Sequence, residues 1–160
     1  GEVEEAIRAW KGIESQNPDY LSLAAERLLD AYERQGRAAE GVVLLRGYLR
    51  SYPQLELLDV LYPKIAALHG DAAALEFLRE TVRGRPSLTG LGRLIEAQLP
   101  GLEPEQRVDA DVARTLVQSH GKRLNVYRCK RCNFRSKMFF WHCPACGEWE
   151  SFTPNRTETQ

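Results

Sequence analysis

The sequence lacks a long apolar segment. Its longest apolar run, residues 41–45, has the sequence GVVLL, whereas a helix that crosses a bilayer needs about 20 predominantly apolar residues. No stretch has the order of charged, apolar and small residues that marks a secretory signal. The 22 basic and 22 acidic residues balance, and 43% of the chain is hydrophobic, as in ordinary soluble proteins with a real core. We therefore expect a soluble chain.

Cysteine is also scarce, and the four cysteines all fall within one short motif near the C-terminus. They are Cys129, Cys132, Cys143 and Cys146, in the pattern C-x2-C-x10-C-x2-C. Two C-x2-C turns that face each other supply four thiolates around one tetrahedral ion. A disulfide-stapled module is the alternative, but metal spacing with no cysteine left over suits a reducing cytosol better. The pattern predicts one four-thiolate site, in which zinc is favoured and iron is possible because both metals accept this donor set.

The residues around the cysteines fit two such turns. Asn133 and Gly147 each follow a C-x2-C pair, at positions where a positive φ is expected and where asparagine and glycine are tolerated. Apolar bulk comes from seven aromatic residues: Tyr127, Phe134, Phe139, Phe140, Trp141, Trp149 and Phe152. A module of fewer than about 40 residues rarely folds on so small a core without a metal. Residues 122–154 are therefore predicted to form a metal ribbon, followed by a disordered tail at 155–160.

Residues 1–121 are predicted to form paired helices that repeat. Gly36 and Gly70 lie at equivalent bends between apolar-periodic segments, and their separation is the tetratricopeptide period. The first full unit has the small, bulky and proline positions of that pattern, at Leu28, Leu29, Tyr32, Gly41, Leu45, Tyr48 and Pro53. We therefore expect a mainly α fold, a tetratricopeptide-type solenoid of helical hairpins with a small metal ribbon at its C-terminal end.

The first repeat is expected to be truncated. Ala6, Trp10, Ile13 and Pro18 reproduce only the second-helix half of a unit, and the chain begins with glycine, so we expect a fragment of a longer protein. Solenoid repeats bury their apolar faces against their neighbours. An incomplete first repeat is expected to expose such a face, through which a dimer is possible.

The later repeats are less regular. Pro63 lies within the first helix of the second unit, where proline removes a backbone hydrogen bond, and a kink or break is expected near residues 61–62. A third pair is predicted over 87–99 and 104–120, closed by Gly121, with Val108, Val112 and Leu116 on one stripe of the last helix. The few residues that follow are too short for independent motion, so the ribbon is expected to pack against this final pair.

The combination of helical repeats and a C-terminal ribbon resembles the lipopolysaccharide assembly protein B family, bacterial regulators at the cytoplasmic face of the inner membrane. The motifs that carry the resemblance are Tyr127-Arg128-Cys129-x-x-Cys132 and Trp141-His142-Cys143-Pro144-x-Cys146-x-x-Trp149. The resemblance covers the whole chain and implies a rubredoxin-like ribbon with the four cysteines as metal ligands. It also implies an N-terminal membrane anchor and further repeats, so we expect this chain to be the C-terminal part of the cytoplasmic portion.

By the same resemblance, the protein is expected to be a non-catalytic adaptor of lipopolysaccharide biosynthesis. Its partners are expected to be proteins, among them the lipid A pathway deacetylase, which the family is implicated in presenting to a membrane AAA protease. The residues support a binding protein independently, since there is no P-loop motif and none of the three histidines, His69, His120 and His142, lies in a catalytic pattern. A closed four-thiolate site also has no open position for a substrate.

Two other functions remain open from the sequence. Iron in a four-thiolate site can carry electrons, which makes a rubredoxin-like electron carrier one alternative. The second is a nucleic-acid-binding zinc ribbon, because residues 121–160 hold 8 basic and 3 acidic residues against 14 and 19 in residues 1–120. Its candidate contacts are Lys122, Arg123, Arg128, Lys130, Arg131, Arg135 and Lys137, with Phe139, Phe140 and Trp141 as stacking groups, although these aromatic residues suit a core better. Similarly, His142 as a replacement metal ligand is weaker than the four cysteines.

Overall fold

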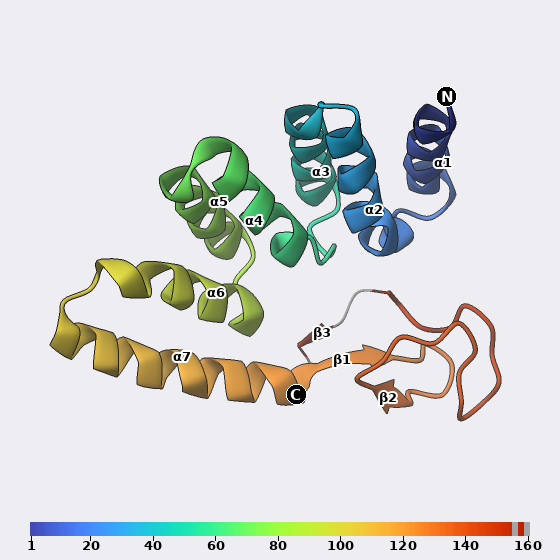
Figure 1. Ribbon diagram of the computed structural model, residues 1–160. Helices are drawn as coiled ribbons and strands as arrows, with labels where there is room; N and C mark the ends of the chain where they lie inside the picture. The colour runs from blue at the N-terminus through green and yellow to red at the C-terminus, as the bar shows by residue number, and fades with distance from the viewer. Residues whose placement is uncertain (155–156, 159–160) are drawn as a thin grey trace. The chain divides into compact units, whose positions relative to one another are not determined.

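The structure, a computed structural model, describes residues 1–154 and 157–158. Within these residues seven α-helices precede three short β-strands (Figure 1), so the predicted mainly α fold class, with helical pairs and a small C-terminal ribbon, is confirmed. Across the described part of the chain, no helix combines the length and apolar character that crossing a bilayer requires. The helices and the ribbon fall into two compact units, residues 1–64 with 127–156 and residues 65–126 with 157–160.

The first unit is built on three helices, α1 (Glu2–Gln16), α2 (Leu21–Arg34) and α3 (Ala38–Ser51), with a short 3-10 turn, η1 (Pro18–Tyr20), before α2. α2 packs against both α1 and α3. Its apolar positions recur at helical spacing and form the core of the unit: Leu21, Ala24, Ala25, Leu28, Leu29, Ala31 and Tyr32 are all buried. Val42, Leu45 and Tyr48 of α3 are buried as well, so the predicted apolar stripes of this helical pair are confirmed.

A tight turn joins α2 to α3, and two glycines make the hairpin possible. Gly36 has φ of 69°, a left-handed conformation that glycine adopts without steric cost. Gly41 lies where the two helices approach most closely, because a Cβ atom built there would be 2.9 Å from Leu29 Cδ2 and 3.0 Å from Tyr32 Cβ. The small residue at this tetratricopeptide position therefore sets the distance between the helices.

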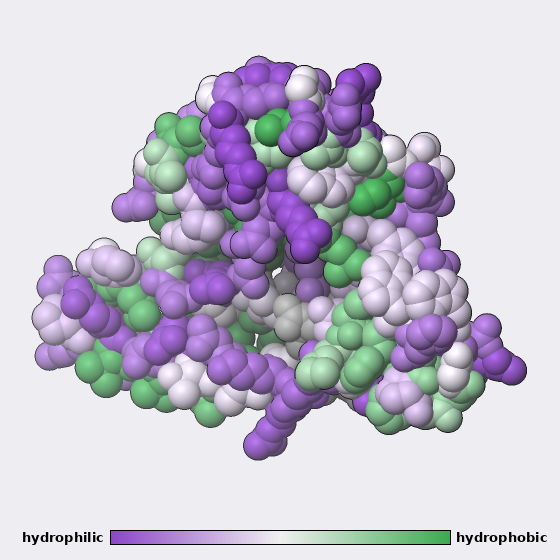
Figure 2. Space-filling view, turned by 45° about the vertical axis from the view of Figure 1, so that its right-hand side comes forward, coloured by the Kyte–Doolittle hydropathy of each residue, from purple (hydrophilic) through white to green (hydrophobic). Residues whose placement is uncertain are grey.

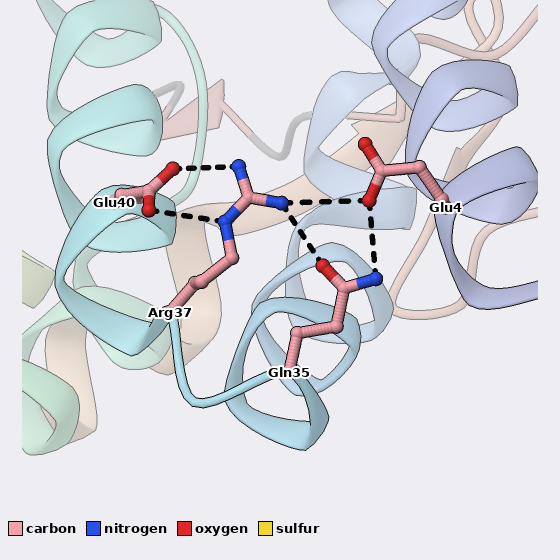
Figure 3. Close-up of polar contacts among 4 residues, drawn as sticks. All are labelled: Glu4, Gln35, Arg37 and Glu40. Atoms are coloured by element: carbon pink, nitrogen blue, oxygen red, sulfur yellow. Dashed lines mark hydrogen bonds and ion pairs between the residues drawn. The ribbon is translucent and has the colours of Figure 1, made fainter. Parts of the chain in front are cut away.

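Polar contacts link the turn of this hairpin to α1 (Figure 3). The Arg37 guanidinium lies between Glu40, to which it donates two hydrogen bonds of 3.0 and 2.6 Å, and Glu4 of α1, at 3.4 Å. Gln35 donates to the same Glu4 carboxylate at 3.1 Å and accepts from Arg37 at 3.0 Å. The hydrogen bond to Arg37 lowers the pKa of Glu40. All these groups are partly exposed, so the network is expected to orient α1 more than to stabilise the fold.

Helix α4 (Leu58–His69) runs without interruption through Pro63, so of the kink or break expected near residues 61–62 the break is wrong, and the kink stays a prediction. The helix begins at Leu58, so Pro63 lies in its second turn, where proline still removes one backbone hydrogen bond. The last helical residue, His69, is followed by Gly70 with φ of 86°. Gly70 is also the N-cap of α5 (Asp71–Gly84), and its carbonyl accepts from Ala74 N at 3.2 Å.

The second unit contains α5, α6 (Leu88–Gln98) and α7 (Pro104–Leu124), with a short 3-10 turn, η2 (Leu99–Gly101), between the last two helices. α6 packs against both α5 and α7. The Ser87 side chain caps α6 by accepting a hydrogen bond from Gly90 N at 3.0 Å. Gly121, expected to end the last helix, instead lies inside it, because its bare backbone packs against Leu88 of α6, whose Cβ would be 3.4 Å from an added Cβ.

One face of α7 carries exposed apolar side chains. Val108, Val112 and Leu116 share a stripe, as predicted, and are 65%, 57% and 64% exposed. Figure 2 shows hydrophobic side chains interspersed with hydrophilic ones along this helix. Its packing on α6 comes from the opposite side, where Gly92 of α6 lies close to Val117 and Gln118.

The region expected to be a disordered tail is only partly described. Residues 155, 156, 159 and 160 lie outside the described residues. Thr157–Glu158 form strand β3, which pairs antiparallel with Asn125 and Val126 at the start of β1 (Asn125–Arg128). A disordered tail is therefore the wrong description for these two residues, since backbone pairing with β1 gives them a regular conformation.

Candidate metal centre

The four cysteines come together at one point of the ribbon. Their sulfur atoms all lie within 4.8 Å of one another. The sulfurs of Cys129 and Cys146 are 3.8 Å apart, and those of Cys132 and Cys143 are 3.6 Å apart. A tetrahedral ion with metal–sulfur bonds of about 2.3 Å requires sulfur–sulfur distances of about 3.8 Å. The donor set and its spacing therefore fit one metal ion.

Two backbone turns of the same design hold the sulfurs. In the first, Asn133 N donates to Cys129 O at 3.0 Å and Cys129 N donates to Phe134 O at 2.9 Å. In the second, Gly147 N donates to Cys143 O at 2.8 Å and Cys143 N donates to Glu148 O at 2.9 Å.

Each turn closes with a residue in the left-handed region. Asn133 has φ of 64° and Gly147 has φ of 71°, so the positive φ predicted at both positions is confirmed. The ribbon therefore presents its four thiols from two equivalent turns, one residue of each pair being deeply buried, Cys129 and Cys143.

A small aromatic core supports the turns. Phe152 is fully buried with Cys129 and Cys143, and its ring packs edge-on against Phe134 and Phe140. Strand β1 pairs antiparallel with β2 (Arg135–Ser136), with Tyr127 opposite Ser136 and Arg128 opposite Arg135. Because the buried sulfurs make up part of the core itself, a metal ion would replace apolar packing that such a short segment cannot supply.

A stack of aromatic rings joins the ribbon to the first helical pair. Trp141 stacks on Tyr20 at the start of α2, with ring centroids 5.4 Å apart and planes 11° apart. Trp141 also stacks on Trp149, with ring centroids 5.9 Å apart. The structure therefore places a ribbon contact on the first helical pair, whereas the sequence predicted packing on the last one. The short connection after α7 suggested the last pair, but it does not determine which side of the ribbon carries exposed aromatic rings.

The cysteine thiols differ in their pKa values. Burial opposes ionisation of Cys129, but hydrogen bonds from Ser151 and from nearby backbone amides outweigh it and lower the pKa of this thiol to about 6. A backbone amide at Phe134 favours the Cys132 thiolate, yet burial and the neighbouring sulfurs together raise the pKa of Cys132 to about 12. Burial also raises the pKa of Cys146. Of these three thiols, that of Cys129 therefore ionises most readily, and metal binding requires the thiolate form.

The other candidate residues lie around the site without entering it. The His142 ring is 4.3 Å from that of Trp149, and among the described residues the metal-binding group contains the four cysteines alone. Arg131 of the first turn forms an ion pair with Glu148 of the second. Of the proposed stacking groups for nucleic acid, Phe139 and Phe140 are packed against the ribbon core, and Trp141 is already in ring contact with Tyr20 and Trp149.

Three residues that matter here were not predicted from the sequence. Ser151 is buried beside Cys129, Tyr20 receives Trp141, and Glu150 has a positive φ of 49°. Burial, together with the negative charges of Glu150 and Asp19, raises the pKa of Tyr20. None of the three belongs to a motif, since a buried serine and a tyrosine on a helix carry no local signal of a metal centre.

The fold and the site together define a class of protein, helical repeats that carry a closed four-cysteine ribbon. A family model described as the rubredoxin metal binding domain matches residues 127–154.

Beyond the ribbon, the chain is 25% identical over 157 residues to lipopolysaccharide assembly protein B of Escherichia coli strain K12, a match that covers 98% of this chain and 40% of the relative. The protein of the same name from Haemophilus influenzae is also 25% identical, with 96% of this chain and 39% of the relative covered. The resemblance to these proteins is therefore confirmed along nearly the whole chain, which spans about two fifths of their length.

Proposed function

We propose that this chain is the repeat-and-ribbon part of a regulatory scaffold in bacterial lipopolysaccharide biosynthesis. The observation that carries the proposal is the union of a four-thiolate ribbon with helical hairpins in one compact unit. The similarity to proteins named lipopolysaccharide assembly protein B supports the pathway. The helical repeats, up to about residue 121 and with an incomplete first repeat, would bind protein partners, and the ribbon, up to residue 154, would stabilise that surface.

In this proposal Cys129, Cys132, Cys143 and Cys146 ligate a single ion with a structural role. Zinc is the favoured metal, because a closed set of four thiolates matches its structural sites. The sulfurs lie in the core of the ribbon, so the ion would fix both turns and, through Trp141, the contact with Tyr20. The metal would thereby act on partner binding through the shape of the first unit.

The proposed role is non-catalytic. Four protein ligands leave a metal ion no open position for water or substrate. His142 packs against Trp149, and the acidic residues that the structure describes in ion pairs, such as Glu33, Glu40 and Asp111, lie in partly exposed surface contacts. Such contacts are typical of helical surfaces.

The partners follow from the resemblance. We propose that they are proteins, namely the lipid A pathway deacetylase and a membrane AAA protease that degrades it, and that the protein acts at the cytoplasmic face of the inner membrane. Membrane contact would be made by an N-terminal anchor outside this chain. A dimer through the incomplete first repeat is a further part of the proposal, and nucleic acid is not among the proposed partners.

Reconstitution tests the proposal. Full-length protein that contains this region is immobilised, and capture of purified deacetylase and of the protease is measured for the wild type and for a Cys143→Ser, Cys146→Ser variant. We expect metal to be lost from the variant, partner capture to weaken and the helical content of the repeats to remain. Capture that is absent from the wild type would contradict the adaptor role, and capture unchanged by complete metal loss would contradict the role of the ribbon.

An iron electron carrier is the second candidate. The observation in its favour is that Cys132 is exposed while its three partners are less so, which gives electrons a short path from a four-sulfur site to the surface. This function requires a red, iron-containing protein with a reversible redox wave. Zinc-only protein from iron-replete cells, without such a wave, would contradict it.

A further inference from the structure

A buried serine touches the metal centre. Ser151 is only 5% exposed, so its polar side chain is buried. Its Oγ lies 3.2 Å from Cys129 Sγ and 3.3 Å from the carbonyl oxygen of Glu148. The Ser151 carbonyl in turn accepts from Lys130 N at 2.7 Å. Backbone and side chain thus both fix this hydroxyl beside one sulfur.

The hydroxyl joins the two cysteine turns. Cys129 belongs to the first turn, and the Glu148 carbonyl belongs to the second, where it also accepts from Cys143 N at 2.9 Å. The other buried sulfur, that of Cys143, lies 3.6 Å from the sulfur of Cys132. The two turns share the backbone hydrogen bonds described above, but Cys129 Sγ also accepts from Cys132 N at 3.5 Å and lies beside the Ser151 hydroxyl.

The Ser151 hydroxyl can form its hydrogen bonds in two arrangements, depending on whether Cys129 is a thiol or a thiolate. A hydroxyl has one hydrogen to donate and can accept at the same time. While Cys129 is a thiol, its S–H can donate to Ser151 Oγ, and the hydroxyl hydrogen can go to the Glu148 carbonyl. A metal-bound thiolate has no hydrogen and can only accept. The Ser151 hydroxyl must then donate its hydrogen to Cys129 Sγ instead of to the Glu148 carbonyl. The Glu148 carbonyl keeps its bond from Cys143 N, and no buried group loses its last partner.

We propose that Ser151 is a positioning residue of the metal centre, whose hydroxyl donates to the Cys129 thiolate when the ion is bound. Outer-shell groups that hydrogen-bond to metal ligands typically contribute about 10- to 100-fold to metal affinity. A hydrogen bond to a thiolate also draws electron density away from the sulfur. The hydroxyl therefore slows metal loss and raises the energy of charge transfer from sulfur to the metal.

The experiment compares Ser151→Ala with Ser151→Thr, which keeps a hydroxyl, and with Ser136→Ala as a matched control. Ser136 lies in the same ribbon, where its hydroxyl accepts from the backbone, from Met138 N at 3.0 Å. Two quantities are measured on protein loaded with one ion per chain: the rate of zinc transfer to a chelator at neutral pH, and the sulfur-to-cobalt charge-transfer band of the cobalt form.

Ser151→Ala is expected to release zinc about 10- to 100-fold faster than the wild type and to shift the charge-transfer band to lower energy. Ser151→Thr is expected to restore both values toward the wild type, and Ser136→Ala to leave them unchanged. A general loss of packing would not move the band in this direction while the four-thiolate spectrum persists. Wild-type release and an unmoved band in Ser151→Ala would overturn the proposal.

A measurement on the wild type covers the case in which Ser151→Ala does not fold. NMR of the protein loaded with a spin-active cadmium isotope is expected to show a slowly exchanging hydroxyl proton coupled to the metal through Cys129 Sγ, and a spectrum without it would overturn the proposal. The inference rests on metal binding as proposed above. A wild-type protein that takes up no metal would contradict the metal centre itself, whereas a loaded protein indifferent to Ser151 would contradict only the role of the serine.

Discussion

The close approach of α2 and α3 at Gly41 gives the sharpest prediction for the helical part. Gly41 and Gly47 lie in the same helix, α3. A Cβ atom at Gly47 would have no neighbour within 4 Å, whereas one at Gly41 would meet Leu29 Cδ2 at 2.9 Å and Tyr32 Cβ at 3.0 Å. The Leu29 methyl group can turn aside, but the Tyr32 Cβ is fixed to the backbone of α2.

The two alanine substitutions should therefore have different effects. Either one removes glycine from a helix, which is worth about 1 kcal/mol of stability in a helix interior. Gly47→Ala is expected to gain about this amount. Gly41→Ala gains the same helix preference but also overpacks the core, at a typical cost of about 1–3 kcal/mol. The difference between the two variants should therefore be about 1–3 kcal/mol.

Thermal unfolding of the metal-loaded protein, followed by far-UV circular dichroism, measures this difference. For a chain of this size, 1 kcal/mol corresponds to about 2–4 °C in Tm, so Gly47→Ala is expected to melt several degrees above Gly41→Ala. The wild type should fall below Gly47→Ala. A Gly41→Ala variant that melts at the same temperature as Gly47→Ala, or higher, would refute the close approach of the two helices.

Further predictions concern the ribbon and the first unit. A double-mutant cycle of Tyr20→Ala and Trp141→Ala, followed by denaturant unfolding, should give a coupling of about 0.5–1.5 kcal/mol for the stacked rings, and additive effects would argue against the stack. Gly147→Ala should destabilise the second cysteine turn by about 1 kcal/mol or more, because alanine is strained at this positive φ. Zinc should then be released faster, and an unchanged release rate would show that the second turn tolerates a side chain. Burial and the nearby Glu14 raise the pKa of Tyr48 to about 12, so its folded-state pKa exceeds its unfolded value of about 10. The contribution of Tyr48 to the free energy of unfolding should then be fully present below about pH 10 and be lost between about pH 10 and 12. Tyr48→Phe should weaken this pH dependence, and an equal loss of stability in both proteins would show that another group causes it.

Much of the helical architecture could be predicted because its signals are local. Gly36 and Gly70, one repeat apart, mark bends in sequence and have positive φ in the structure. The apolar stripes of α2 and α3 follow helical periodicity and are buried. The prediction that Gly121 ends the last helix failed because glycine can have either of two roles in a helix. Glycine ends many helices, but it also lets two helices approach, and only the position of Leu88 decides between them.

The candidate site divides in the same way. Spacing alone identified the four cysteines and the two positive-φ residues, since a C-x2-C turn is a short-range structure. Ser151 and Tyr20 could not be found from spacing, because each meets its partner through the folding of distant segments: Ser151 is 22 residues from Cys129, and Tyr20 meets Trp141 from the opposite end of the chain.

The central claim is that four thiolates from two facing turns hold a single ion. X-ray absorption at the metal edge of the purified protein, together with metal analysis, tests it most directly. The account predicts one zinc or iron per chain, surrounded by four sulfur atoms at about 2.3 Å. Protein that carries no metal and contains cysteines joined in disulfides, or a metal with nitrogen or oxygen among its ligands, would contradict it.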